Sequence, residues 1–165
     1  MKADRLVYLD AAATSLMPKA TYAGLGKYFE RACANPHTDA HLSGRATTQA
    51  IEDSRAALAR LFRAPAEDYA TIFCGSGSTA ALNRAARIVR SLPMGNRDTI
   101  IVSAMEHHSN QLPWTETGRV VFAPTRLDGA LDMAALRSLI RSESPRLRAV
   151  AVSAASNVTG AVTPI

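Results

Sequence analysis

Residues 71 to 90 read Thr-Ile-Phe-Cys-Gly-Ser-Gly-Ser-Thr-Ala-Ala-Leu-Asn-Arg-Ala-Ala-Arg-Ile-Val-Arg. The first four residues form a short apolar run typical of a buried strand, and a glycine turn follows. Residues 80–90 then have the composition of a helix. Strand, glycine turn and helix in this order make half of a βαβ unit. We therefore expect an α/β fold with a mostly parallel sheet.

The same alternation continues toward the end of the sequence. We expect strands over 99–103, 119–123 and 147–153, with a short helix over 109–114 and a longer one over 133–141. Upstream, Pro18 suits the first turn of a helix that runs to about residue 33, and a second helix is expected from Ser43 to near Pro65. We divide the chain into an N-terminal segment, 1–34, and an α/β domain, 35–165.

Composition excludes several classes of protein. The 165 residues are 47% hydrophobic and carry a net charge of +5 from sixteen arginines and three lysines. The arginines alternate with acids and no aromatic residues are interleaved with them, which indicates a solvated surface and no nucleic-acid partner. No apolar stretch approaches the roughly 20 residues of a membrane span, and cysteines are sparse. We expect a cytoplasmic protein with no membrane partner.

The glycine turn at 75–79 places small residues and hydroxyls where a helix begins. Free backbone N–H groups and the positive end of the helix dipole suit a phosphate at such a point. The turn is not a nucleotide P-loop, because its spacing differs and no lysine follows the second glycine. It also departs from the GxGxxG dinucleotide pattern. By itself the turn is weak evidence for phosphate binding.

Two histidine pairs are candidates for chemistry. Glu106, His107 and His108 follow a predicted strand and could form a metal site, supply general acid–base groups, or offer a surface on which a flat ligand stacks. Adjacent side chains on an extended segment point to opposite sides, so one histidine is expected to face a given ligand. His37 and His41 have metal-ligand spacing, but loop positions with a helix-capping histidine are favoured, and we expect no metal site.

Asn157 lies in the polar stretch 153–160 that closes the last predicted strand. Its amide can donate and accept hydrogen bonds at once, as a ligand contact requires. Taken alone, a turn asparagine that caps the strand is the better interpretation.

Five segments in this order resemble aminotransferase class V, the pyridoxal-phosphate enzymes that include cysteine desulfurases and selenocysteine lyases. The segments are Tyr-Leu-Asp-Ala-Ala-Ala-Thr at 8–14, Asn-Pro-His at 35–37 with Ser-Gly-Arg-Ala at 43–46, Gly-Ser-Thr at 77–79 with Asn83, Met-Glu-His-His-Ser-Asn at 105–110 with Pro113 and Trp114, and Ser-Asn-Val-Thr-Gly at 156–160. The resemblance implies an incomplete large domain of a fold type I pyridoxal-phosphate transferase, with flanking helices on a mostly parallel sheet.

The resemblance also implies site residues. Ser78 and Thr79 match the positions that hold the cofactor phosphate. His107 matches the imidazole that stacks on the pyridine ring and moves protons, which is a catalytic role. Asn157 matches the side chain bonded to the 3′-oxygen of the ring. A weaker correspondence places four residues near the substrate pocket: Ala12, Ala13, His37 and His41.

One departure from the family pattern concerns lysine. In the family, the Schiff-base lysine and the aspartate facing the ring nitrogen come after the asparagine segment, whereas Lys2, Lys19 and Lys27 all precede residue 28 here. We therefore expect this chain to be inactive alone, as a truncated portion or one half of a split enzyme.

The complete enzyme is expected to act on an amino acid, as a desulfurase or an aminotransferase, and to be a homodimer or to pair with a complementary C-terminal chain. The alternative is a non-catalytic remnant, or a split-enzyme half, that binds a partner chain or a phosphate-bearing ligand.

Overall fold

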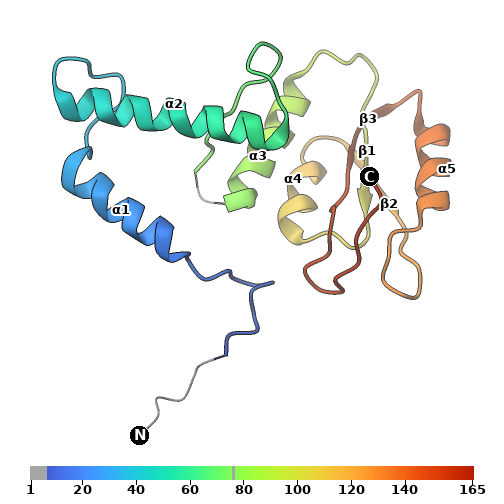
Figure 1. Ribbon diagram of the computed structural model, residues 1–165. Coiled ribbons are helices and arrows are strands. Elements are labelled where there is room, and N and C mark those ends of the chain that lie inside the picture. Colours follow the sequence, from blue (N-terminus) through green and yellow to red (C-terminus); the bar gives the residue numbers. More distant parts are fainter. Residues whose placement is uncertain (1–6, 76) are drawn as a thin grey trace, which may run out of the picture. The chain divides into compact units, whose positions relative to one another are not determined.

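The computed structural model describes residues 7–75 and 77–165 (Figure 1). The chain forms two compact units, Met1–Ile72 and Phe73–Ile165, and each is described by itself. The expected division after residue 34 stays a prediction. In the described ranges, no helix is both long enough and apolar enough to cross a membrane.

The first unit contains two helices, α1 (Lys19–Arg31) and α2 (Leu42–Phe62). Pro18 occupies the N-cap position of α1, close to the predicted start. At α2 the cap is His41, whose side chain accepts a hydrogen bond from the backbone N–H of Gly44, and not Ser43 as expected. A ring nitrogen acts here as the acceptor that serine usually supplies.

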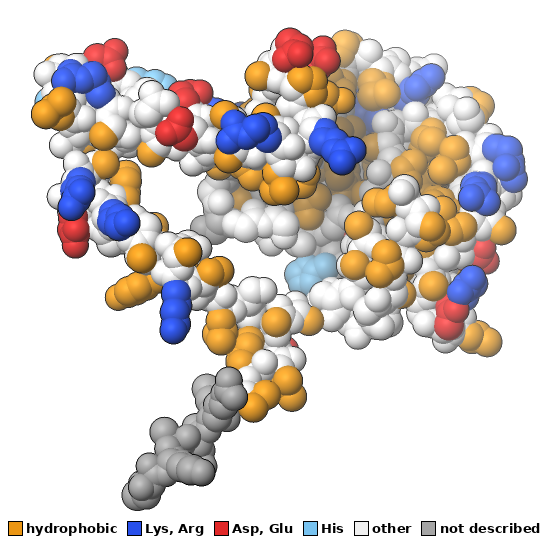
Figure 2. Space-filling model, in the orientation of Figure 1, with side chains coloured by type: hydrophobic (Ala, Val, Ile, Leu, Met, Phe, Trp, Pro, Cys, Tyr) orange, Lys and Arg blue, Asp and Glu red, His pale blue; other side chains and the backbone are white. Residues whose placement is uncertain are grey.

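Polar contacts hold the first unit together. The Thr47 hydroxyl donates to the carbonyl of Ala32, just beyond α1. Among the described residues of this unit only Gly44 and Thr47 are buried. Apolar side chains such as Phe29 and Phe62 are exposed, and Figure 2 shows hydrophobic groups along these helices. The part of the unit that the structure describes therefore has no apolar core.

The second unit is an α/β layer. Its elements are α3 (Gly77–Ser91), β1 (Thr99–Ser103), the 3-10 helix η1 (His108–Asn110), α4 (Leu112–Thr115), β2 (Arg119–Ala123), α5 (Met133–Glu143) and β3 (Leu147–Ala151). The strands form a parallel sheet in the order β2-β1-β3. The predicted strand at 99–103 is confirmed, as is the one at 119–123.

Strand β1 lies at the centre of the sheet and all five of its residues are buried. Alternate side chains of a strand face opposite sides. Ile100 and Val102 pack with Trp114 in one core cluster, whereas Ile101 packs with Leu136 in another. In Figure 1, α3 and α4 lie on one side of the sheet and α5 on the other. The two clusters are therefore the two helix–sheet interfaces.

The strand predicted over 71–74 is wrong. These residues lie outside the three-stranded sheet, and Ile72 and Phe73 are 55% and 54% exposed. Strand propensity depends strongly on the tertiary context of a segment, so an apolar run alone does not specify a strand. The run also spans the division between the two compact units, Ile72 ending one and Phe73 beginning the other.

Other boundaries also differ from the expected ones. Helix α3 begins at Gly77, three residues before the predicted start. The helix predicted over 109–114 is divided into η1 and α4. Strand β3 ends at Ala151 because the backbone N–H of Ser153 donates to the Glu106 carboxylate and not to the sheet.

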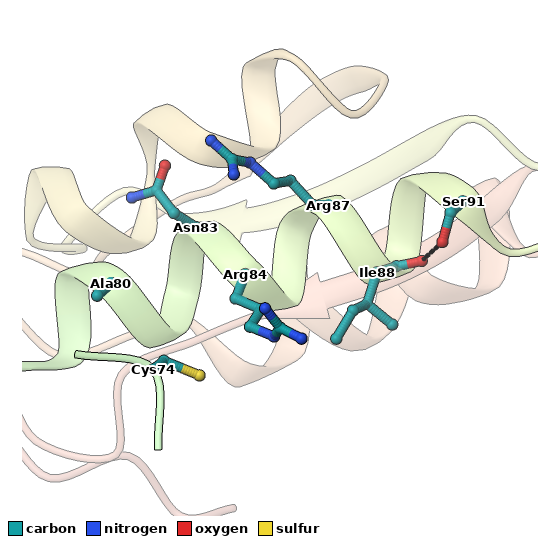
Figure 3. Close-up of a pocket in the computed structure, with 7 residues that line it drawn as sticks. All are labelled: Cys74, Ala80, Asn83, Arg84, Arg87, Ile88 and Ser91. Atoms are coloured by element: carbon teal, nitrogen blue, oxygen red, sulfur yellow. Dashed lines mark hydrogen bonds between the residues drawn. The ribbon is translucent and has the colours of Figure 1, made fainter. Parts of the chain in front are cut away.

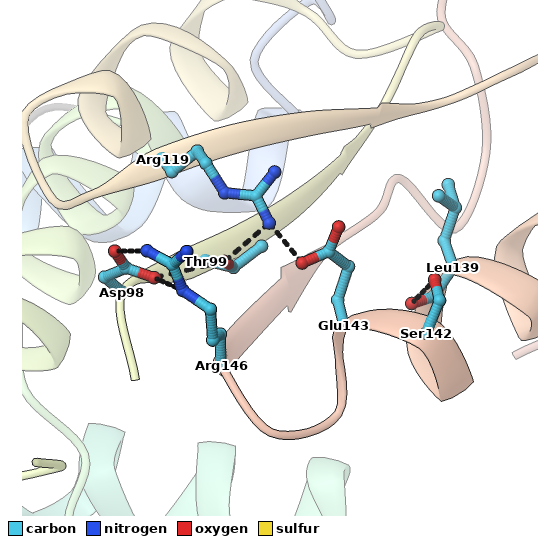
Figure 4. A network of polar contacts seen from close by, with 7 residues as sticks. All are labelled: Asp98, Thr99, Arg119, Leu139, Ser142, Glu143 and Arg146. Atoms are coloured by element: carbon cyan, nitrogen blue, oxygen red, sulfur yellow. Dashed lines mark hydrogen bonds and ion pairs between the residues drawn. The ribbon is translucent and has the colours of Figure 1, made fainter. Parts of the chain in front are cut away.

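Charged side chains gather at the amino ends of the strands (Figure 4). Arg146 pairs with Asp98, and Arg119 bonds both Thr99 and Glu143. The hydrogen bond from Arg146 lowers the pKa of the Asp98 carboxyl below its ordinary value. This network lies at the end of β1 opposite to the loop that carries the histidine pair.

Candidate functional site

His107 lies four residues after β1, where the sequence predicts a ligand contact. The residue is the N-cap of η1, and its Nδ1 accepts a hydrogen bond from the backbone N–H of Ser109 at 3.1 Å. The Ser109 hydroxyl lies 2.9 Å from the same nitrogen. Because Nδ1 acts as an acceptor, the neutral imidazole carries its proton on Nε2. The local turn therefore fixes both the tautomer and the orientation of an exposed ring.

The start of α3 supplies the candidate phosphate contacts. Ser78 and Thr79 lie in the first turn of this 15-residue helix, and that turn contains no acidic residue. One turn further on, the Asn83 amide donates to the Thr79 carbonyl at 2.9 Å. The first N–H groups of a helix have no intrahelical acceptor and point toward its positive end. The geometry suits an anion.

Thr79 and His107 line the same cavity, which has a volume of about 390 Å³. Its wall consists of Thr79, Asn83, His107, His108, Ser109, Leu112, Pro113 and Glu116. Small-molecule sites are commonly concave and about 300–1,000 Å³ in volume. The structure thus brings together two residues that the sequence singled out 28 positions apart.

The prediction that only one histidine would face a ligand is wrong for this cavity. His107 and His108 both line it, with ring centroids 6.3 Å apart and planes inclined at 49°. The prediction assumed an extended backbone, whereas His108 is the first residue of a 3-10 helix. A turn of helix brings neighbouring side chains to the same side more readily than a strand does.

Asn157 is exposed and lies in a compact turn after β3. The preceding Ser156 is buried, and its hydroxyl accepts hydrogen bonds from the backbone N–H groups of Val158 and Thr159, both at 3.2 Å. The turn closes with an antiparallel bridge between Ala155 and Val162. Asn157 is not among the residues that line the cavity, so its predicted ring contact stays a prediction.

Glu106 has a function that spacing alone does not reveal. Its Oε1 accepts from the Ser153 backbone N–H at 2.6 Å and from the Ser103 hydroxyl. Its Oε2 accepts from Asn110 Nδ2 at 2.7 Å and from the Ser153 hydroxyl. The carboxylate therefore connects the loop after β1 to the segment after β3. Its position directly before His107 was the one sequence signal that could have suggested that Glu106 connects these two segments.

The four weaker candidates lie in the first unit. Ala12 and Ala13 belong to a turn in which the Asp10 carbonyl accepts from the N–H of Ala13 at 3.2 Å. The backbone N–H of His37, which has a φ of 60°, donates to the Thr48 hydroxyl. His41 caps α2. The capping histidine and the loop position of His37 agree with the interpretation favoured over zinc, and the proximity of all four residues to a substrate stays a prediction.

A second cavity, of about 550 Å³, lies along α3 (Figure 3). Asn83 and Arg87 extend toward the side of the helix that faces α4, whereas Arg84 and Ile88 extend from the opposite side, where Cys74 also lies. None of the histidines lines this space. Among the residues that the structure describes, no group of three His, Cys, Asp or Glu side chains could hold a metal ion.

Comparison with known proteins identifies the family. The model of the family Aminotransferase class-V matches residues 7–165. The chain belongs to this family.

Several relatives and one solved structure are similar to this class V chain over nearly its whole length. A probable cysteine desulfurase of Vibrio cholerae is 37% identical over 97% of the chain and 40% of its own length. Cysteine desulfurase CsdA of Escherichia coli is 35% identical over 95% of the chain and 39% of its own length. A crystal structure of that desulfurase superposes with a TM-score of 0.73 at 32% identity, covering 95% of this chain and 39% of the other.

These comparisons confirm the predicted family and the α/β fold of a fold type I pyridoxal-phosphate enzyme. The class V chain spans about two fifths of the length of the relatives it matches.

Proposed function

We propose that this class V chain forms the N-terminal, cofactor-binding portion of a pyridoxal-phosphate enzyme that acts on an amino acid, in the manner of a cysteine desulfurase. The observation that carries the proposal is the single cavity lined by Thr79, Asn83 and His107. It combines a helix N-terminus with an oriented imidazole, which are the two chemical features that a phosphorylated aromatic ring needs.

The residues present fit pyridoxal phosphate at two points. The first turn of α3, with the hydroxyls of Ser78 and Thr79 and no acidic side chain, would hold the phosphate. The exposed imidazole of His107 would lie against the ring. When bound, the cofactor supplies an electron sink for reactions at the amino acid's α-carbon.

The protein's own part is to bind and orient. The Ser109 backbone N–H holds His107 Nδ1, so the Nε2 proton is the one that this residue can hold or give up at the site. We propose that Asn157 donates to or accepts from the ring's 3′-oxygen. Ala12, Ala13, His37 and His41 are proposed to border the amino-acid substrate.

The remaining assignments are also proposals. The cytoplasm is the proposed location, which the sparse cysteine content supports. A homodimer is the proposed assembly, and pairing with a complementary C-terminal chain is the alternative.

Equilibrium titration with pyridoxal phosphate tests the proposal. We expect saturable binding to the wild-type chain, a loss of affinity of at least about ten-fold in Thr79→Val, and competition by inorganic phosphate. Ser142→Ala on α5 is the matched control because it also removes one hydroxyl, and it should bind as the wild type does. Undetectable binding, or equal affinities of wild type and Thr79→Val, would refute the proposed function.

A further inference from the structure

The Glu106 carboxylate is satisfied by four donors from two separate parts of the chain. Ser103 and Asn110 belong to the end of β1 and the loop after it, and Ser153 belongs to the segment after β3. Ser153 contributes both its backbone N–H and its hydroxyl. A charged acceptor makes such hydrogen bonds shorter and stronger than neutral ones. Glu106 therefore joins segments 47 residues apart.

Each of these segments carries one proposed ring contact. His107 follows Glu106 directly, and Ser153 begins the turn that contains Asn157. Ser153 is also tied to the far side of that turn, since its carbonyl accepts from the Thr163 hydroxyl at 2.7 Å. The Glu106 carboxylate thus connects the loop that carries His107 to the start of the segment that carries Asn157.

The network extends into the core. Asn110, which donates to Glu106, accepts from the indole N–H of Trp114 at 3.1 Å. Trp114 is buried beside Ile100 and is the sole tryptophan of the sequence. Its indole therefore anchors the hydrogen-bond chain on the sheet and offers a spectroscopic signal for it.

We propose that Glu106 is a positioning residue that fixes the loop of His107 and the turn of Asn157 relative to each other for the ligand that these two residues are proposed to contact. This inference rests on the proposed function for the identity of the ligand. The linkage itself rests on the hydrogen bonds of Glu106, which exist without any ligand.

Glutamine is the sharpest substitution because it keeps the shape, removes the charge and replaces one acceptor oxygen with an amide donor. If its amide nitrogen replaces Oε1, it faces the Ser153 backbone N–H, which cannot become an acceptor. If the nitrogen replaces Oε2, it faces the amide group of Asn110. Rotating Asn110 would then turn that amide toward the indole N–H of Trp114. Each arrangement leaves two donors facing each other, so no orientation of the introduced glutamine amide and the Asn110 amide satisfies all of these hydrogen bonds.

The test compares Glu106→Gln with Glu143→Gln, a matched change at the opposite end of the sheet, in the full chain without and with pyridoxal phosphate. Without ligand, we expect the NMR signals of the Trp114 indole, the His107 ring and the Asn157 side chain all to shift in Glu106→Gln and to stay in place in Glu143→Gln. With ligand, affinity should fall at least about ten-fold in Glu106→Gln alone. If Glu106→Gln folds poorly, Ser153→Ala takes its place in the test. It removes a single hydroxyl donor and should produce smaller shifts in the same direction.

The outcomes separate the inference from the proposed function. Unchanged Asn157 signals in both Glu106→Gln and Ser153→Ala would overturn the inference, even if pyridoxal phosphate binds. If the wild type binds no pyridoxal phosphate, the proposed function fails. The ligand-free shifts of His107 and Asn157 would still decide whether Glu106 fixes the two segments.

Discussion

Replacing Arg148 should destabilise the second unit more than any other exchange of a single arginine in that unit. Its guanidinium donates to four backbone carbonyls at or beyond the end of α3. Nε bonds Val89 at 3.0 Å, Nη1 bonds Arg97 at 3.0 Å, and Nη2 bonds Arg90 at 3.0 Å and Leu92 at 2.7 Å. These include carbonyls that a helix end leaves without an intrahelical partner, and a cation there also complements the helix dipole.

The magnitude follows from the environment of each bond. The bond to Val89 is part-buried and involves a charged donor, so it is worth about 1.5–3 kcal/mol. The other three are exposed, where water replaces the lost donor, and contribute a few tenths of a kcal/mol each. Arg148→Ala should therefore lower the free energy of unfolding of the second unit, Phe73–Ile165, by about 3 kcal/mol and its Tm by roughly 12–24 °C. Arg148→Lys keeps the charge without the planar fork and should lose about half as much.

Urea unfolding followed by Trp114 fluorescence measures this loss, because the sole tryptophan lies in the core of the second unit. Arg90→Ala is the control, since it removes one charge at the same helix end while its side chain makes none of the four bonds. We expect Arg90→Ala to cost less than about 0.5 kcal/mol. An Arg148→Ala variant as stable as Arg90→Ala would refute the assignment of Arg148 as the cap of α3.

Two further predictions concern stability. The hydrogen bond from Arg146 lowers the pKa of Asp98 from 3.8, so the pair stabilises the fold above that pH, and this contribution is lost as the pH falls through the lowered value. Asp98→Asn should therefore show a smaller drop in Tm than the wild type between about pH 5 and pH 2.5. An equal drop in both proteins would contradict this prediction. A Cβ on Gly118 would overlap the Asp98 carbonyl oxygen, so Gly118→Ala should cost about 1–3 kcal/mol. A Cβ on Gly24 in α1 would meet nothing within 4 Å, so Gly24→Ala should leave the Tm unchanged or raise it. Equal effects of the two substitutions on the Tm would count against the close approach of Gly118 to the Asp98 carbonyl.

Local sequence patterns predicted most elements of the second unit. A β-branched apolar run gave β1 its bounds, and Asp132, whose carboxylate caps α5 through the N–H groups of Ala134 and Ala135, explains why that helix begins at Met133. The same reasoning failed at 71–74, because strand propensity depends on the tertiary context of a segment, which the local sequence does not give.

Single candidate residues could be named from the sequence, but their arrangement could not. Thr79 and His107 were identified from a helix start and a strand end, yet only the folded chain shows that they share a cavity. The side chain of His108 was misplaced because the 3-10 turn of η1 has no clear signature in sequence. The contacts of Glu106 and Arg148 join positions some 50 residues apart, which no spacing rule relates.

The central claim is that Thr79 and His107 form two walls of a single pyridoxal-phosphate site. NMR titration of the chain with pyridoxal phosphate, following the Thr79 backbone amide and the His107 ring protons, tests it most directly. The account predicts that both signals shift together and saturate with one shared dissociation constant. Signals of Thr79 and His107 that stay in place while pyridoxal phosphate binds elsewhere, for example at Lys19 or Lys27, would contradict it.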